Sequence, residues 1–162
     1  MKHLGYIMLF VAAPCAASVH PPEVEARLAS MVGDWTVEGM EDVYRETCTW
    51  YGDRSFVVCD MTDTSDDTAS VSVIGYSQAD GHYTYQHYSK AGSSRNEIAF
   101  PFGERGLVFT AERKGANGVS RFSSHFEPLA DGRAHFRQVR SLNGGPWTES
   151  ADLYYVPRSG AH

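Results

Sequence analysis

The chain has 162 residues, a length that suits one domain with a substantial hydrophobic core. Hydrophobic residues make up 42% of the chain and charged residues 21%, which is typical of a folded globular protein and not of a disordered one. The formal net charge is −6 and there is no run of basic residues. This charge argues against nucleic acid and anionic membrane surfaces as partners.

The N-terminal segment has the pattern of an export signal. Lys2 supplies positive charge, residues 4–13 are mainly apolar, and the small residues at 15–18 suit a signal peptidase. The apolar run is too short to span a bilayer comfortably, and no later segment has the length and hydropathy of a membrane span. We therefore expect removal of residues 1–18, a periplasmic or secreted location, and a single domain over residues 22–158.

The three cysteines fit an exported protein. Cys15 leaves with the signal peptide, unless it is the lipidated residue of a lipoprotein signal, an alternative that Pro14 disfavours. Cys48 and Cys59 remain as an even pair, separated by a segment typical of a hairpin that turns near Asp53. Such a hairpin places the two cysteines opposite each other on adjacent antiparallel strands, so we expect a disulfide between them. Their spacing does not match a zinc or redox motif.

One short amphipathic helix is predicted after the signal, over residues 21–31. The prolines at its start suit the first turn of a helix, and Val24, Leu28 and Met31 recur at helical spacing. Gly33 is then expected to end the helix.

The rest of the chain is typical of strands and turns. Apolar and polar residues alternate, as in Phe122, Ser124 and Phe126. Turn signals recur at short intervals, at Asp53, Asp66-Asp67, Asp80-Gly81, Ala91-Gly92, Phe102-Gly103, Gly115 to Gly118, Asp131-Gly132 and Asn143 to Gly145. These breaks predict about nine strands joined as hairpins. Such a meander removes its exposed edges by stacking as a sandwich or by closing as a barrel.

A short helix followed by Gly33-Asp34-Trp35 and a long run of hairpins resembles the lipocalin-like (calycin) families, which carry Gly-x-Trp at this place. The segments Val73–Tyr76 and Tyr83–Tyr85, with an Asp-Gly turn between them, are similar to a bacterial calycin-like domain family of unknown function. The resemblance implies an all-β fold, an antiparallel up-and-down β-barrel of about 8–10 strands with a short N-terminal helix.

The same resemblance implies a role for Trp35. Its indole would plug the closed end of the barrel, with a basic side chain from a late strand lying across the ring. Arg140 and Arg158 are the candidates by position. We interpret Gly33, Asp34 and Trp35 as a structural motif and not as a ligand site.

Catalytic and metal-binding motifs are missing from the sequence. It contains no nucleophile elbow, Walker A, zinc-protease or dinucleotide fingerprint, so no catalytic residue and no metal ligand is assigned. His82 and His87 are expected on opposite faces of one strand, and His125 and His135 flank a turn as plausible cross-strand neighbours. Two histidines fall short of a zinc site. By resemblance to haem-binding barrels, haem held by His135 or His125 is an alternative, and otherwise no cofactor is expected.

Aromatic residues on the predicted strands favour a binding role. An eight-stranded barrel is just wide enough to be filled by its side chains or to hold one small ligand. The residues that would line such a pocket are Tyr83, Tyr85, Phe109, Phe122, Phe126, Phe136, Gln138 and Arg140. By resemblance to the lipocalin-like families, the first hypothesis is a carrier of a small apolar or amphipathic ligand. The alternatives are an interaction module with a packed interior and a barrel enzyme that uses a histidine or tyrosine as acid or base.

Overall fold

The computed structural model describes residues 19–158, so the expected export signal lies outside the described residues. Within that range there is one helix, α1 (Pro22–Ala29), and no helix is long and apolar enough to cross a membrane. The strands are β1 (Gly33–Val37), β2 (Tyr44–Tyr51), β3 (Phe56–Asp63), β4 (Thr68–Ser77), β5 (His82–Ser89), β6 (Ser94–Phe102), β7 (Gly106–Gly115), β8 (Gly118–Pro128), β9 (Ala134–Leu142) and β10 (Thr148–Pro157).

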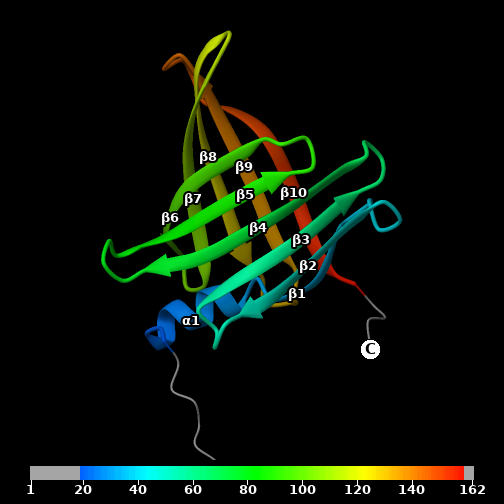
Figure 1. Ribbon diagram of the computed structural model, residues 1–162. Helices are drawn as coiled ribbons and strands as arrows, with labels where there is room; N and C mark the ends of the chain where they lie inside the picture. The colour runs from blue at the N-terminus through cyan, green and yellow to red at the C-terminus, as the bar shows by residue number, and fades with distance from the viewer. Residues whose placement is uncertain (1–18, 159–162) are drawn as a thin grey trace, which may run out of the picture.

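The ten strands close into one antiparallel barrel (Figure 1). Each strand pairs with the next along the chain, and β1 closes the ring by pairing with β10, where Trp35 lies opposite Pro157. Closure gives every strand two neighbours, so the sheet has no free edge. The predicted up-and-down β-barrel with a short helix is confirmed, and the sandwich alternative is wrong.

The first strand of the barrel, β1, is short. It ends at Val37, and the chain turns through Gly39, which has a φ of 81°. The backbone N–H of Met40 donates to the carbonyl oxygen of Val37 at 2.9 Å, and the N–H of Gly39 donates to the Glu41 carboxylate at 2.9 Å. This turn is the break that the sequence analysis missed, and it raises the number of strands from nine to ten.

Helix α1 lies across one end of the barrel (Figure 1). Pro22 stands in its first turn, where a missing N–H costs nothing, and Val24 and Leu28 form its buried face. Arg27 fixes the helix to the β6–β7 turn by donating to the carbonyl oxygens of Gly106 at 2.7 Å and Gly103 at 3.0 Å. The most deeply buried side chains of the core belong to Leu28, Val57, Tyr83 and Leu107.

The Gly-x-Trp motif joins the helix to the barrel. A Cβ atom on Gly33 would lie 3.2 Å from the indole nitrogen of Trp35, so the ring packs directly on a residue without a side chain. The indole N–H donates to the carbonyl oxygen of Met31 at 2.9 Å. This hydrogen bond and the close contact explain why a glycine stands two residues before the tryptophan.

The basic residue expected across Trp35 is not there. The guanidinium of Arg140 lies over the ring of Phe122 instead, 5.7 Å from its centroid. Arg158 contacts the motif through its backbone, donating its N–H to the carbonyl oxygen of Asp34 at 2.9 Å. Within residues 19–158, no cation–π contact involves Trp35. The prediction was wrong because β9 places Arg140 opposite Phe122 of β8 and not beside β1.

The expected disulfide is present. Cys48 of β2 and Cys59 of β3 are direct partners in the strand register, with Cα atoms 4.0 Å apart, and their sulfur atoms are bonded. Both residues face the barrel interior, where they contribute to the buried core.

Strands β6 and β7 separate in one half of the barrel. They pair from Phe102 opposite Gly106 to Ile98 opposite Thr110, and not beyond. Past that point, residues 94–97 of β6 remain paired with β5, and residues 111–115 of β7 remain paired with β8. In Figure 1 the tip of the β7–β8 hairpin projects beyond β5 and β6, at the end of the barrel opposite α1. The wall therefore has a lateral gap at the end opposite α1.

Candidate ligand-binding site

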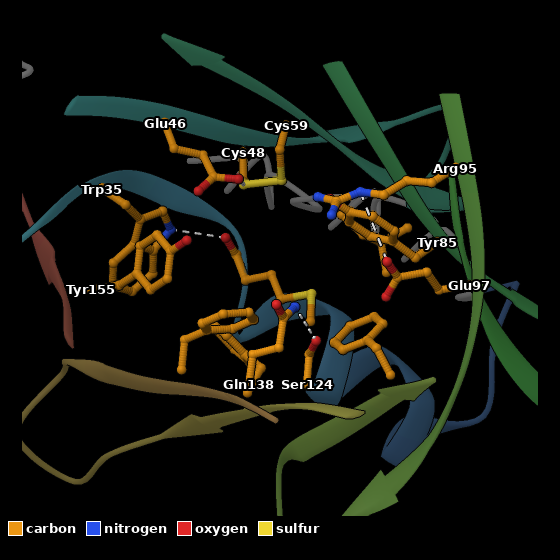
Figure 2. Close-up of a pocket in the computed structure, with 15 residues that line it drawn as sticks. Trp35, Glu46, Cys48, Cys59, Tyr85, Arg95, Glu97, Ser124, Gln138 and Tyr155 are labelled. Atoms are coloured by element: carbon orange, nitrogen blue, oxygen red, sulfur yellow. Dashed lines mark hydrogen bonds and ion pairs between the residues drawn. A yellow bond between two sulfur atoms is a disulfide. The ribbon is translucent and has the colours of Figure 1, made fainter. Parts of the chain in front are cut away.

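A cavity of about 150 Å³ lies inside the barrel (Figure 2). Most of its lining is apolar, and the polar groups stand on a few side chains that converge on it. The lining residues are Met31, Trp35, Glu46, Cys48, Cys59, Ile74, Tyr85, Arg95, Glu97, Phe109, Ser124, Phe126, Phe136, Gln138 and Tyr155.

The residues predicted to bind a ligand divide into three groups. Those that line the cavity are Tyr85, Phe109, Phe126, Phe136 and Gln138. Tyr83 points inward but belongs to the packed core near α1, where it is 2% exposed. Phe122 and Arg140 lie outside the cavity lining, and Arg140 donates to the Ser120 hydroxyl at 2.9 Å. Alternation therefore predicts which residues face inward, but it does not separate the core from the cavity.

Glu46 and Tyr155 line one wall of the cavity, and Tyr44 contacts both of them. The Tyr44 hydroxyl donates to Glu46 at 2.8 Å and lies 3.4 Å from the Tyr155 hydroxyl. Burial raises the pKa of Glu46, because removing the carboxylate from water disfavours its charged form, and the hydrogen bond from Tyr44 opposes this only in part. Burial also raises the pKa of both tyrosines. This wall therefore favours a neutral carboxyl beside two neutral hydroxyls.

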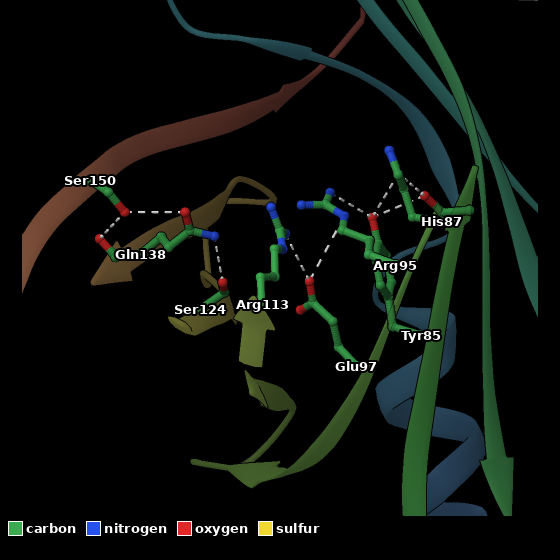
Figure 3. Close-up of polar contacts among 9 residues, drawn as sticks. Tyr85, His87, Arg95, Glu97, Arg113, Ser124, Gln138 and Ser150 are labelled. Carbon is green, nitrogen blue, oxygen red and sulfur yellow. Dashed lines mark hydrogen bonds and ion pairs between the residues drawn. The ribbon is translucent and has the colours of Figure 1, made fainter. Parts of the chain in front are cut away.

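At the opposite wall, two arginines surround one carboxylate, and of these three residues Arg95 and Glu97 line the cavity (Figure 3). Glu97 of β6 is buried, and its Oε1 atom lies 3.8 Å from Nε of Arg95 and 3.7 Å from Nη2 of Arg113. Arg113 belongs to β7, so its ion pair with Glu97 crosses the gap between the two strands. Burial and the neighbouring Arg95 lower the pKa of Arg113, although a guanidinium stays protonated in proteins.

Tyr85 connects this wall to β4. Its hydroxyl receives a hydrogen bond from Nη2 of Arg95 at 3.3 Å and lies 3.0 Å from the Ser72 hydroxyl. Nδ1 of His87 is 3.2 Å from the same serine. Burial, followed by the positive charges of Arg95 and Arg113, lowers the pKa of His87, so the neutral imidazole is favoured.

A separate polar pair lies near the aromatic side of the cavity. The Gln138 amide donates to the Ser124 hydroxyl at 2.8 Å, and its oxygen accepts from Ser150 at 3.1 Å. These contacts, drawn in Figure 3, fix the orientation of the amide at the cavity wall.

The other histidines are placed away from the cavity. His82 lies against Phe100, and it faces opposite to His87, as expected. His125 packs on Phe102, and Nε2 of His135 lies 2.7 Å from the Asp152 carboxylate. His125 and His135 are offset in the strand register, where His125 pairs with Arg137 and His135 with Glu127, so they are not direct partners. Neither histidine suggested for haem lines the cavity.

One group of metal-ligating residue types gathers inside the barrel. Ligand atoms of Glu46, Cys48 and Cys59 all lie within 4.8 Å of one another. The two sulfur atoms are bonded to each other, so they are not available as the thiolates that bind zinc.

A second hollow, of about 740 Å³, opens at the gap between β6 and β7. It shares Tyr85 and Glu97 with the inner cavity, and Phe122 and Trp147 contribute to its wall. The gap therefore lies beside the arginine wall, and the two hollows adjoin each other at Tyr85 and Glu97.

Sequence reasoning missed the charged residues of the site. Glu46, Arg95, Glu97 and Arg113 all face inward, although charged residues are mostly exposed in proteins. A signal was present in the Ala91-Gly92 turn. Folding β5 and β6 about that turn places Glu97 opposite Tyr85, which had been assigned to the interior.

The fold and the site place the protein in the class of closed antiparallel barrels that contain a small, mainly apolar cavity with a few buried ionisable groups. No protein-family model matches the chain, and no curated protein matches it.

The buried carboxyl of Glu46 gives a prediction for stability against pH. An acid whose pKa is raised by folding binds more protons in the folded chain than in the unfolded chain, so its contribution to stability is present below the ordinary value of 4.5 and is lost as pH rises through the folded pKa. Glu46→Gln cannot ionise and keeps an acceptor for Tyr44. We expect the variant to gain stability relative to the natural protein as pH rises above 4.5. Urea unfolding at a series of pH values measures the difference.

The control is Glu112→Gln, which removes an exposed carboxylate paired with Arg121. It should show no comparable dependence on pH. Parallel stability profiles for Glu46→Gln and the natural protein would contradict a raised pKa.

Proposed function

We propose that the barrel binds and carries a small apolar or amphipathic molecule in its interior cavity. The observation that supports this most directly is the cavity of about 150 Å³ with a mainly apolar lining and convergent polar side chains. An engineered cavity of roughly this size, lined by apolar side chains, stays dry and takes up benzene. A packed interaction module would not have a cavity so much larger than a water molecule.

The proposal includes a relationship to the lipocalin-like families and an exported location. The ten-stranded barrel and the contact of Trp35 with Gly33 support the relationship. The disulfide between Cys48 and Cys59 supports an oxidising compartment, because such bonds are rare where thiols are kept reduced.

A cavity-filling variant tests ligand binding. Ile74 is 3% exposed and lines the cavity, whereas Val71 on the same strand is 39% exposed and faces outward. Ile74→Phe should weaken binding of an apolar fluorescent dye by about tenfold or more, because the larger side chain occupies the space of the ligand. Val71→Phe should bind the dye as the natural protein does. Circular dichroism and thermal unfolding establish that both variants fold.

Displacement of the dye by fatty acids, quinones and porphyrins, together with native mass spectrometry of protein purified from its host, then identifies the ligand class. If no compound binds, and Ile74→Phe behaves as Val71→Phe does, the proposal is wrong.

A second candidate function is acid–base catalysis on the bound molecule. It is favoured by one observation, that Glu46 with a raised pKa faces the cavity beside the Tyr155 hydroxyl. Prolonged incubation with the identified ligand, followed by mass spectrometry, separates the two functions. A carrier returns the ligand unchanged, whereas an enzyme converts it in a reaction that Glu46→Gln abolishes.

A further inference from the structure

The charge inside the barrel differs in sign from the charge of the whole chain. The chain has a formal net charge of −6, yet Arg95, Arg113 and Arg140 all stand at inward-facing positions of their strands. On the far wall, Glu46 has a raised pKa and so contributes less negative charge than an exposed carboxylate. An acidic protein that concentrates guanidinium groups at its cavity provides a local environment for an anion.

Arg95 and Arg113 share one partner, the Glu97 carboxylate, and both ion pairs with it are long. Both ion pairs end on the same oxygen atom of Glu97, at 3.8 Å for Arg95 and 3.7 Å for Arg113. These distances exceed those of charge-assisted hydrogen bonds, which lie at about 2.7–2.9 Å. Nε of Arg95 is buried and has no hydrogen-bond partner in the described part of the chain. One carboxylate therefore faces two cations, and it leaves the Nε donor of Arg95 unsatisfied.

The geometry suits a second carboxylate. Figure 3 shows the guanidinium groups of Arg95 and Arg113 reaching toward each other from β6 and β7, above the Glu97 side chain. The fork of N–H donors on a guanidinium matches the two oxygens of a carboxylate, and an added anion would balance the two positive charges. A cationic ligand would be repelled here, and a neutral ligand would leave the second positive charge without a counter-charge.

The rest of the cavity limits the size and polarity of the remainder of the ligand. Beyond Arg95 the lining consists mainly of apolar side chains, including Ile74, Phe109 and Phe126. Its volume of about 150 Å³ suits a body near the size of one aromatic ring and not a long acyl chain.

We infer that the cavity takes a small organic acid, with its carboxylate held between Arg95 and Arg113 and an apolar body of about one ring against Ile74, Phe109 and Phe126. This inference rests on the proposed binding function and names the chemical class of its ligand. The gap between β6 and β7, where the outer hollow adjoins the cavity at Tyr85 and Glu97, is the side from which we expect the acid to enter.

Matched probes test the inference at neutral pH. Phenylacetate carries the acid, and phenylethanol has the same ring with a neutral hydroxyl in its place. Isothermal titration should show phenylacetate binding about tenfold tighter or more, since charge-assisted hydrogen bonds are roughly twice as strong as neutral ones. Phenylethylamine, the cationic analogue, should not bind.

Two variants locate the headgroup. Arg113 has a 43% exposed side chain, so Arg113→Met should fold. The variant should bind phenylacetate about tenfold more weakly, and its affinity for phenylethanol should change by less than about twofold. Arg121→Met is the control, because it removes the same charge from an exposed outer position on the neighbouring strand. Glu97→Gln removes the competing carboxylate and should strengthen phenylacetate binding.

The outcomes separate the inference from the proposed function. The acid site would be overturned if phenylacetate and phenylethanol bind with equal affinity, or if Arg113→Met loses affinity for both by the same factor. Either result leaves the carrier proposal intact. The acid site is also overturned if the apolar dye binds and phenylacetate does not displace it. If neither the dye nor either probe binds, the carrier proposal itself fails.

Discussion

Replacing both Cys48 and Cys59 with alanine should lower the free energy of unfolding by about 3 kcal/mol. The disulfide closes a loop with a sequence separation of 11, and the expected effect of such a cross-link on the entropy of the unfolded chain is of that size. For a domain of this length, the midpoint of thermal unfolding should fall by roughly 10 °C. Urea and thermal unfolding, followed by tryptophan fluorescence and circular dichroism, measure both quantities.

Reduction of the natural protein provides an independent comparison. A dithiol reductant breaks the same bond without changing the side-chain volume, so the reduced protein should lose most of the stability that the double variant loses. An unfolding midpoint that stays the same after complete reduction would show that the cross-link does not contribute to stability.

Leu28→Ala should cost about 3 kcal/mol through loss of packing between α1 and the barrel. Leu28 is fully buried in the cluster that contains Val57, Tyr83 and Leu107. Alanine is the best helix former, so the substitution removes apolar contacts without weakening the helix itself. Chemical denaturation gives the free energy difference directly.

Leu142→Ala is the matched control, because it makes the same truncation at a position that is 42% exposed. Its effect should stay within about 0.5 kcal/mol. If both variants lose little free energy of unfolding, α1 does not support the end of the barrel. If both lose a large amount, the exposed Leu142 also has a packing role.

The fold could be predicted because local signals and global closure agree. Alternation places Phe122, Ser124 and Phe126 on one face of β8, and the structure directs all three inward. The pairing of Cys48 with Cys59 followed from counting back from a turn, which needs only local geometry. One connection was missed because Gly39 continues the alternation of Trp35 and Val37 and no Asn-Gly or Asp-Gly pair marks the turn.

The site was predicted only in part, for a physical reason. Aromatic residues are recognised as interior from hydrophobic periodicity, and Phe109 and Phe136 do line the cavity. Arg95 and Glu97 obey the same alternation, but charged residues are expected in water unless a partner compensates them. Their partner is Arg113 on another strand, and the sequence does not show that β6 and β7 part just where these three residues meet.

The pairing of the first strand with the last also constrains how the barrel forms. Trp35 meets Pro157 across the closing seam, so contacts there join positions near opposite ends of the described chain. Contacts of such long sequence separation slow folding, because a large loop must be ordered before they form. Until β10 pairs with β1, the folding chain therefore has two unpaired sheet edges, and each can pair with another copy.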